Sequence, residues 1–294
     1  MEPFSSIMAL NAFKTCWPPN LTLPIGTNMS MSGRILIVAG SDSGGGAGIQ
    51  ADVKTVTALG GYAATAITAL TAQNTRGVFG IAGIDPAFIA QQMQVVLEDI
   101  GADCVKTGML HNAAVIETVA GVLERAASGI PVVVDPVMYA KGGDSLLDPA
   151  ARETLVRRLL PKAALMTPNV REAEALSGLA IRQPDDLAKA ARQLLELGPA
   201  AVLVKGGHLA GATVTDWLVW PDGSKAFTTA RMTSRNTHGT GCTLASAIAT
   251  GLAQGLTLSG SVERALAYVQ EAIRTAPDLG KGCGPLNHGH TVRH

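Results

Sequence analysis

Apolar residues recur along the chain in two alternating patterns, and each pattern predicts one kind of element. Short unbroken apolar runs rich in β-branched residues, such as 34–40 and 132–134, predict buried strands. Longer stretches in which apolar residues recur every three or four positions, such as the one from Ile49 to Leu59, predict helices. The predicted strands cover 34–40, 62–70, 104–107, 132–134, 164–166 and 201–204, and a predicted hairpin covers 215–219 and 225–228. The predicted helices cover 86–99, 113–127, 149–160, 170–177 and 185–197, and others begin at 49, 242 and 261.

The alternation of strands and helices predicts an α/β fold with a mostly parallel central sheet that helices cover on both faces. Neither a linker nor an internal repeat interrupts it, so we expect a single domain over residues 33–294. Residues 1–32 differ, because they contain several prolines and no sustained period. An early Glu2 and a single basic residue, Lys14, argue against a secretory signal there. We expect residues 1–32 to be a disordered extension.

Composition narrows the class of protein further. Of the 294 residues, 47% are hydrophobic and 16% charged, which is enough apolar material for a sizeable core. The 23 basic residues balance the 23 acidic ones, so nothing indicates nucleic acid or a membrane surface as partner. The four cysteines are widely spaced and form no CxxC motif, which argues against a zinc site or a disulfide framework. These features fit a cytoplasmic enzyme.

Polar and glycine residues follow nearly every predicted strand. In a parallel sheet, ligands bind beyond the carboxyl ends of the strands, so these residues are the candidates for a site. They are Asp42 with the glycines of 44–48, Gln73 and Asn74, residues 106–109, Asp135, Asn169 with Glu172, and Lys205 with two glycines after it.

The stretch 239–242, Gly-Thr-Gly-Cys, reads as a loop that turns into a helix N-terminus. Unpaired backbone N–H groups and the positive end of the helix dipole favour an anion there, phosphate above all. The same setting predicts a lowered pKa for the Cys242 thiol, which would make it a base or a nucleophile. The alternative is that Cys242 is a small buried apolar residue.

Three other features allow two interpretations each. Asn169 and Glu172 share a helix face and could hold Mg²⁺ together with Asp135, or they could be an N-cap and its N3 partner. Lys205 could reach a phosphate, or it could simply end a strand. The glycines of 44–48 match neither the P-loop nor the GxGxxG pattern, and they could form a ligand loop or only a tight turn.

Seven motifs occur in a fixed order and together resemble the hydroxymethylpyrimidine/phosphomethylpyrimidine kinases of thiamine biosynthesis, a family of the ribokinase superfamily. The resemblance covers about 34–285. The motifs are AGSDSGGGAGIQAD (39–52), TALTAQN (68–74), KTGML (106–110), DPVM (135–138), TPN (167–169), KGGH (205–208) and NTHGTGCT (236–243).

The resemblance implies a ribokinase-like α/β/α sandwich and two successive phosphorylations by ATP. The first acceptor would be 4-amino-5-hydroxymethyl-2-methylpyrimidine, and the second its monophosphate. It also implies a homodimer, and it matches residues 141–144 to a loop that covers the phosphates. By motif position, the pyrimidine pocket would consist of Gly40, Asp52, Gln73, Met109 and Val137. The anion hole would consist of Gly239, Thr240, Gly241 and Cys242, and Cys242 would accept the hydroxyl proton. Magnesium and ATP would bind Asn169, Glu172, Lys205 and Asp135, with the metal on Glu172 or Asp135.

Two other functions remain open. Pyridoxal kinases of the same subgroup also phosphorylate a hydroxymethyl group on an aromatic nitrogen ring. A relative that binds the pyrimidine without transferring phosphate is the second alternative. Cys242, Lys205 and the Asn169–Glu172 pair stand where a transfer reaction would use them, which favours the kinase.

Overall fold

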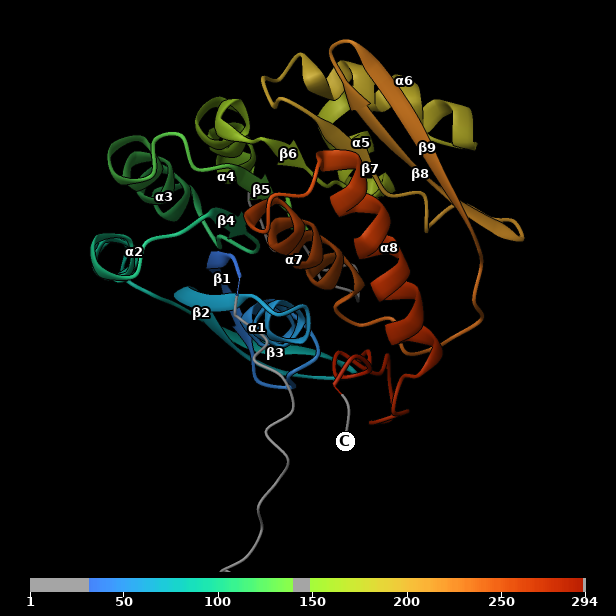
Figure 1. The fold of residues 1–294 in the computed structure, drawn as a ribbon, viewed down its shortest axis with the longest axis horizontal. Coiled ribbons are helices and arrows are strands. Elements are labelled where there is room, and N and C mark those ends of the chain that lie inside the picture. The colour runs from blue at the N-terminus through green and yellow to red at the C-terminus, as the bar shows by residue number, and fades with distance from the viewer. Residues whose placement is uncertain (1–31, 140–148, 293–294) are drawn as a thin grey trace, which may run out of the picture. The chain divides into compact units, whose positions relative to one another are not determined.

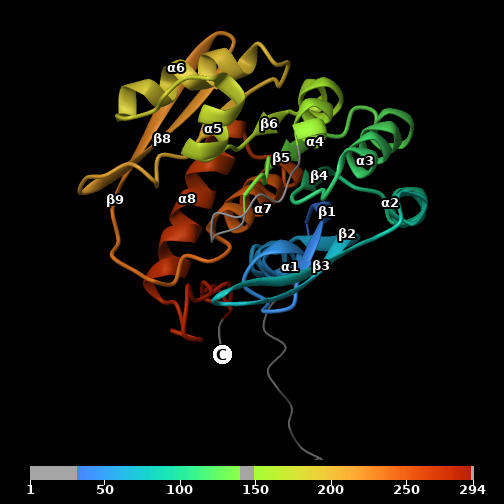
Figure 2. The ribbon, with the colours of Figure 1, turned by 180° about the vertical axis from the view of Figure 1, so that it is seen from behind.

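A computed structural model describes residues 32–139 and 149–292. In these residues a nine-stranded sheet lies between two layers of helices (Figures 1 and 2). The strands are β1 (Arg34–Asp42), β2 (Tyr62–Asn74), β3 (Gly77–Gly83), β4 (Cys104–Thr107), β5 (Val132–Val134), β6 (Leu165–Met166), β7 (Val202–Val204), β8 (Thr213–Trp220) and β9 (Gly223–Ala230). The helices are α1 (Gly48–Ala58), α2 (Pro86–Asp99), α3 (Ala113–Ala126), α4 (Pro149–Thr154), α5 (Val170–Ser177), α6 (Pro184–Leu195), α7 (Thr240–Ala253) and α8 (Leu258–Arg274).

The centre of the sheet is parallel, as the alternation of strands and helices predicts. The strand order is β3-β2-β1-β4-β5-β6-β7-β8-β9, and the six strands from β2 to β7 in this order are parallel to one another. Antiparallel partners close both sides, with β3 beside β2, and β8 and β9 beside β7. The carboxyl ends of the six parallel strands therefore meet at one edge of the sheet.

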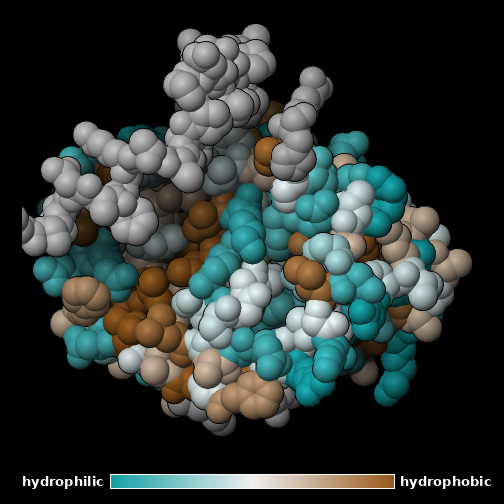
Figure 3. Space-filling view, turned by 90° about the horizontal axis from the view of Figure 1, so that it is seen from below, coloured by the Kyte–Doolittle hydropathy of each residue, from teal (hydrophilic) through white to brown (hydrophobic). Residues whose placement is uncertain are grey.

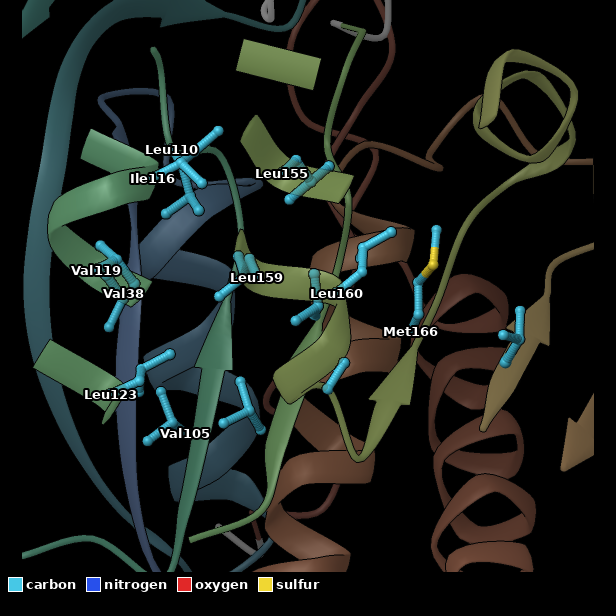
Figure 4. Packing of buried hydrophobic residues seen from close by; sticks show 14 of the residues in the cluster. Val38, Val105, Leu110, Ile116, Val119, Leu123, Leu155, Leu159, Leu160 and Met166 are labelled. Atoms are coloured by element: carbon cyan, nitrogen blue, oxygen red, sulfur yellow. The ribbon is translucent and has the colours of Figure 1, made fainter. Parts of the chain in front are cut away.

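Alternate residues of each buried strand pack into two separate cores. Along β1, Leu36 and Val38 belong to one core, and Ile35 and Ile37 to the other. Helices α2, α3, α5 and α6 and the segment 149–162 contribute to the first core, and α1, α7 and α8 to the second. Figure 4 shows the first core, where side chains of α3 and of 155–160 meet those of the strands. Burial on both faces explains why these strands are unbroken apolar runs.

Helix boundaries agree with the predicted ranges to within a few residues where capping residues mark them. α2 begins at Pro86. The carboxylate of the preceding residue, Asp85, caps the helix by accepting hydrogen bonds from the N–H groups of Ala87 and Phe88. The predicted helix 149–160 is less regular. It begins as α4, continues as a π-helical turn (Leu155–Leu159), and ends in a 3-10 turn (Leu160–Lys162) that contains Pro161.

Two features of the first half differ from the prediction. β2 extends to Asn74 and pairs with β3, a strand that was not predicted, because its three glycines weaken the strand pattern. The predicted apolar stripe of α1 packs against the second core, with Val56 buried and Ile49, Val53 and Leu59 partly buried, but the fully buried face also contains Ala51, Asp52 and Thr55. A carboxylate on a buried helix face requires a partner, and the site described below contains it.

Candidate active site

A cavity of about 490 Å³ opens where the parallel strands end. Its volume is in the range of small-molecule binding sites. All the predicted site residues except Asp52 line it: Gly40, Gln73, Met109, Asp135, Val137, Asn169, Glu172, Lys205, Gly239, Thr240, Gly241 and Cys242. The predicted loop 141–144 and residues 1–31 lie outside the described residues.

The N-terminus of α7 faces this cavity without a side-chain cap. Its N-cap residue, Gly239, is left-handed, with φ 83°, and no side chain of the described residues hydrogen-bonds to the helix start. A Cβ atom at Gly239 would overlap the carbonyl oxygen of Gly46, so only glycine fits this conformation and this contact. The Thr240 N–H donates to the Thr237 carbonyl at 3.4 Å, but among the described residues the N–H groups of Gly241 and Cys242 meet no acceptor, so these two could face an anion, as the motif predicts.

Cys242 lies in that first turn, but the expectation of a lowered thiol pKa was wrong. Burial raises the pKa of Cys242 to about 11, with further increases from the carboxylates of Asp52 and Asp135. The Lys106 ammonium and the Gly48 N–H lower it, but by less. The Cys242 thiol is removed from water, and the increase of its pKa by desolvation is larger than any decrease that the helix terminus causes.

Asp52 does not line the cavity, so this part of the predicted pyrimidine pocket is corrected. Its carboxylate is fully buried and forms an ion pair with Lys106, with Nζ 2.8 Å from both oxygens. The Ser246 hydroxyl of α7 donates to the same carboxylate at 2.7 Å. Lys106 is also fully buried, and its side chain reaches the cavity wall. The ion pair therefore lies beneath the cavity wall, where Asp52 holds the Lys106 side chain in position.

A second ion pair lies beside the start of α7. Lys205 Nζ is 3.0 Å from the Asp135 carboxylate, which also accepts a hydrogen bond from the Thr167 hydroxyl at 3.0 Å. A Cβ atom at Gly241 would lie 3.2 Å from Lys205 Nζ and 3.5 Å from an Asp135 oxygen. The lysine predicted to bind phosphate is thus next to the predicted anion hole.

Asn169 and Glu172 form a capping box at the start of α5. The Asn169 side chain accepts from the Glu172 N–H at 3.1 Å, and the Glu172 carboxylate accepts from the Asn169 N–H at 2.8 Å. The cap interpretation is confirmed, and both residues also line the cavity. Burial raises the pKa of Glu172 to about 7; Lys205 opposes this increase, and Asp135 adds to it.

The described residues contain no cluster of three or more His, Cys, Asp or Glu side chains that could hold a metal ion by themselves. Two carboxylates, Asp135 and Glu172, do line the cavity close to each other and to Lys205. Magnesium typically binds one or two carboxylates and completes its shell with water and phosphate oxygens. This donor set fits a magnesium ion that arrives with a nucleotide.

Asp42, one of the strand-end candidates, lines the cavity together with His238, to which the sequence assigned no role. One Asp42 oxygen accepts from the Gly44 N–H, and the other accepts from Gly46, Ala47 and His238 Nε2. Burial raises the pKa of Asp42, but the hydrogen bonds from His238 and these amides together lower it by more. The pKa of Asp42 therefore lies below its usual value. The N–H groups of the glycine loop are thus satisfied by Asp42 and are not directed at a ligand. An aspartate two residues before a run of glycines, here Asp42 before Gly44, is the signal for such a turn.

The cavity continues past Lys205 into a mainly apolar compartment. Its walls come from β8, β9 and α8 and include Val214, Met232, Leu266, Val269 and Ile273. The pyrimidine residues predicted from the motifs lie at the other end, after β1, β2 and β4. The cavity therefore has two compartments, with Lys205, Asp135 and the α7 N-terminus between them.

Comparison with known proteins supports the resemblance read from the motifs. Residues 42–287 match the family model described as phosphomethylpyrimidine kinase. The hydroxymethylpyrimidine/phosphomethylpyrimidine kinase of Streptomyces coelicolor is 49% identical over 257 residues, which cover 87% of this chain and 94% of that protein. The thiamine biosynthesis bifunctional protein ThiED of Geobacter sulfurreducens is 54% identical over 87% of this chain, which spans about half of that protein (52%).

Solved structures share the fold. The phosphomethylpyrimidine kinase of Clostridium difficile 630 has a TM-score of 0.73 at 42% identity, and the match covers 82% of this chain and 99% of that one. The pyridoxal kinase of Staphylococcus aureus in complex with AMP-PCP and pyridoxal has a TM-score of 0.82 at 33% identity, covering 89% and 95%. Both likenesses confirm the predicted α/β sandwich.

We predict that Lys106→Met lowers the free energy of unfolding by about 3–5 kcal/mol, because it leaves the Asp52 carboxylate buried without its counter-ion. Denaturant unfolding of the variant and the parent measures this difference. Lys54→Met is the matched control, because Lys54 is an exposed lysine whose ammonium donates to the Gly45 carbonyl at 2.9 Å. The double variant Asp52→Leu/Lys106→Met should recover part of the loss, and a single variant as stable as the parent would contradict the prediction.

Proposed function

The chain belongs to the phosphomethylpyrimidine kinase family, and from this premise we propose that it phosphorylates 4-amino-5-hydroxymethyl-2-methylpyrimidine and then the resulting monophosphate. ATP is the phosphoryl donor, and both reactions belong to thiamine biosynthesis. The observation that carries the proposal is the position of Lys205 and Asp135 at the uncapped start of α7, between two compartments of one cavity. This is where a phosphoryl group passing from nucleotide to acceptor needs charge neutralisation.

The acceptor compartment is formed by the residues after β1, β2 and β4. We place the pyrimidine against Gly40, Gln73, Met109 and Val137, with its hydroxymethyl group toward Cys242. A Cβ atom at Gly40 would lie 2.8 Å from the Met109 Cε atom, so glycine here makes room for the methionine side chain. The N–H groups of Gly241 and Cys242, within the predicted anion hole from Gly239 to Cys242, then stabilise negative charge on the transferring phosphoryl group.

The donor compartment binds ATP beyond Lys205. Lys205 contacts the phosphates, and Asn169 and Glu172 hold the magnesium nucleotide together with Asp135. Magnesium would neutralise phosphate charge that a single lysine cannot balance. Glu172 or Asp135 supplies the protein carboxylate for the metal, and the rest of its shell comes from phosphate and water.

Pyridoxine or pyridoxal phosphorylation is the second candidate function. The likeness to the Staphylococcus aureus pyridoxal kinase, which spans both compartments, favours it as an additional or alternative activity. A protein that binds the pyrimidine without transfer is less consistent with Lys205 and Asp135 at the α7 N-terminus.

One assay separates these functions. ATP consumption is measured with hydroxymethylpyrimidine, its monophosphate and pyridoxine side by side, with magnesium and after its removal by a chelator. We expect turnover of the first two acceptors that depends on magnesium. A large preference for pyridoxine would replace the proposal with the second candidate, and binding without turnover would support the non-catalytic relative.

We propose a cytoplasmic location. The described cysteines Cys104, Cys242 and Cys283 are all free. In the described part of the chain, no helix is both long enough and apolar enough to cross a membrane.

Replacing Cys242 should separate the two reactions. We predict that Cys242→Ser or Cys242→Ala lowers phosphorylation of the alcohol about 10²-fold, the usual size of a lost general base. Phosphorylation of the monophosphate should fall less, because that acceptor is already ionised near neutral pH. Because the thiol pKa is about 11, its ionised fraction increases with pH, so kcat/KM for the alcohol should rise from pH 7 to 9 in the parent only.

Cys283→Ser is the control for this experiment, since Cys283 lies at the edge of the same loop with its sulfur 3.4 Å from the Thr237 hydroxyl. Equal losses in both reactions, or a pH profile for the alcohol that Cys242→Ser leaves unchanged, would remove Cys242 from the role of proton acceptor.

We propose that residues 33–294 are the kinase domain and that the first 32 residues are an extension outside it. The match to the family model begins at residue 42, which supports this division. A chain without residues 1–29 should keep its kcat and KM within about twofold, measured in the same ATP assay. A loss of folded protein on truncation would assign the segment to the domain.

We propose that the protein forms a homodimer through the side of the sheet where β3 is the edge strand. Phe79 and Ile81 of the edge strand β3 are 71% and 42% exposed. Leu70 of β2 is 46% exposed but points to the opposite face of the sheet from Ile81, because Leu70 pairs with Ala82 and Ile81 with Thr71. Figure 3 looks onto the side on which β2 and β3 lie in Figure 1, and hydrophobic residues gather there in one area. A second copy of the chain would cover the patch made by Phe79 and Ile81, because monomers rarely leave an apolar edge strand exposed.

A charge in this patch tests the dimer. Phe79→Lys should shift the mass measured by sedimentation equilibrium from two copies to one, whereas Leu179→Lys, at a residue that is 37% exposed and lies just after α5, should not. A parent protein that sediments as a monomer at micromolar concentration would disprove the dimer.

A further inference from the structure

Arg231 lies directly after β9. Its side chain binds backbone carbonyl groups of residues 207–213, which connect β7 to β8. Its Nε donates to the Gly211 carbonyl at 2.7 Å, and its Nη1 donates to the Gly207 carbonyl at 3.0 Å. Its Nη2 donates to the Leu209 carbonyl and reaches that of Thr213 at 3.5 Å. One guanidinium thus joins carbonyl oxygens spread over the whole loop.

The hydrogen-bonding of this arginine differs from that of most surface arginines. Within the described residues, no carboxylate lies within ion-pair distance of Arg231, so its charge is directed only at neutral carbonyl oxygens of one loop. Hydrogen bonds to a charged donor are stronger than those between neutral groups, and the planar guanidinium holds several acceptors in a fixed arrangement. Arg231 therefore determines the shape of 207–213.

Other hydrogen bonds also hold the loop, and the one from the Arg231 N–H to the Ala212 carbonyl at 2.9 Å does not depend on the guanidinium. The Leu209 N–H donates to the Gly206 carbonyl, and the Gly206 N–H donates to the buried Asp216 carboxylate at 2.7 Å. Residues 207, 208 and 210–213 are exposed. Without the guanidinium, the four carbonyl groups that it contacts would lose this donor, and the loop would sample other conformations.

This loop forms one wall of the cavity at the end beyond Lys205. Gly207, His208 and Arg231 all line the cavity there, facing the apolar residues of β8 and α8. The wall is separated from the acceptor compartment by β5 and β6, which lie between β4 and β7 in the sheet. A change in the loop should thus affect the donor compartment and leave the acceptor compartment in place.

We infer that Arg231 is a positioning residue for the phosphoryl donor: by fixing 207–213 it shapes the wall against which the nucleoside part of ATP binds. The inference rests on the proposed function only in naming ATP as the donor. The donor compartment has the cationic Lys205 at its entrance and apolar walls beyond it. These features suit a nucleotide that binds with its phosphates at the lysine and its base between the apolar walls.

The test compares Arg231→Gln and Arg231→Lys with the parent. Equilibrium binding of ADP is measured without acceptor, and KM is measured for ATP and for hydroxymethylpyrimidine. We expect both substitutions to raise the Kd for ADP and the KM for ATP about tenfold, a size typical of a lost charge-assisted contact. The KM for the pyrimidine should stay within twofold. Lysine keeps the charge but cannot span the carbonyls, so it should not restore binding.

Arg235→Gln is the matched control, because Arg235 is four residues further along, exposed, and paired with Asp278 at 2.7 Å. It should leave all three constants unchanged. A lower melting temperature of the Arg231 variants with an unchanged Kd for ADP would overturn the inference, as would an equal rise in the KM of both substrates. If Arg231→Gln reduces the amount of folded protein, Arg231→Lys provides the same comparison.

ADP binding also separates this inference from the proposed function. A parent that binds ADP but does not phosphorylate the pyrimidine would refute the proposed reaction, and the Arg231 variants would still be compared by their affinity for ADP.

Discussion

The buried ion pair between Lys106 and Asp52 is the interaction on which the arrangement of the site depends. Lys106 belongs to β4, Asp52 to α1 and their hydrogen-bonding partner Ser246 to α7, so one pair of charges joins the sheet to two helices. Burying two ions costs several kcal/mol each, which only close and complete pairing offsets. The ion pair thereby restricts how these three elements are arranged. Because Cys242 lies one helical turn before Ser246 on α7, the same contact also fixes the position of Cys242.

The second layer of charge lies nearer the cavity and is less evenly balanced. Asp135 accepts from Lys205 and Thr167, while Glu172 is close enough for Asp135 to raise its pKa. Two carboxylates thus share one lysine. A divalent cation would relieve their repulsion, and phosphate oxygens would supply the ligands that the protein lacks. Two carboxylates alone do not fill the coordination shell of a magnesium ion, so the set of metal ligands is complete only when a nucleotide adds its phosphate oxygens.

The fold was predictable because strands buried on both faces are unbroken apolar runs and most helices carry a clear stripe. The site was predictable as a location, since parallel strands bring their carboxyl ends together, but the chemistry of single residues was not. Asp52 was misplaced because its partner, Lys106, is 54 positions away, and no local pattern reveals that pairing. The pKa of Cys242 was misjudged because the motif shows the helix terminus and not the depth of burial. β3 was missed because pairing with β2, and not its own glycine-rich sequence, makes it a strand.

Glycines explain how segments from distant parts of the chain can form one anion site. The loop after β1 and the loop before α7 approach so closely that a Cβ atom at Gly239 would overlap the Gly46 carbonyl, and one at Gly46 would overlap the His238 ring. Asp42 then fixes both loops, because its carboxylate binds the amides of the first and the imidazole of the second. The start of α7 is therefore positioned by packing between loops and not by a capping side chain. Since the N–H groups of Gly241 and Cys242 meet no acceptor among the described residues, they stay open to an anion, and the stability of this helix end depends on contacts made outside the cavity.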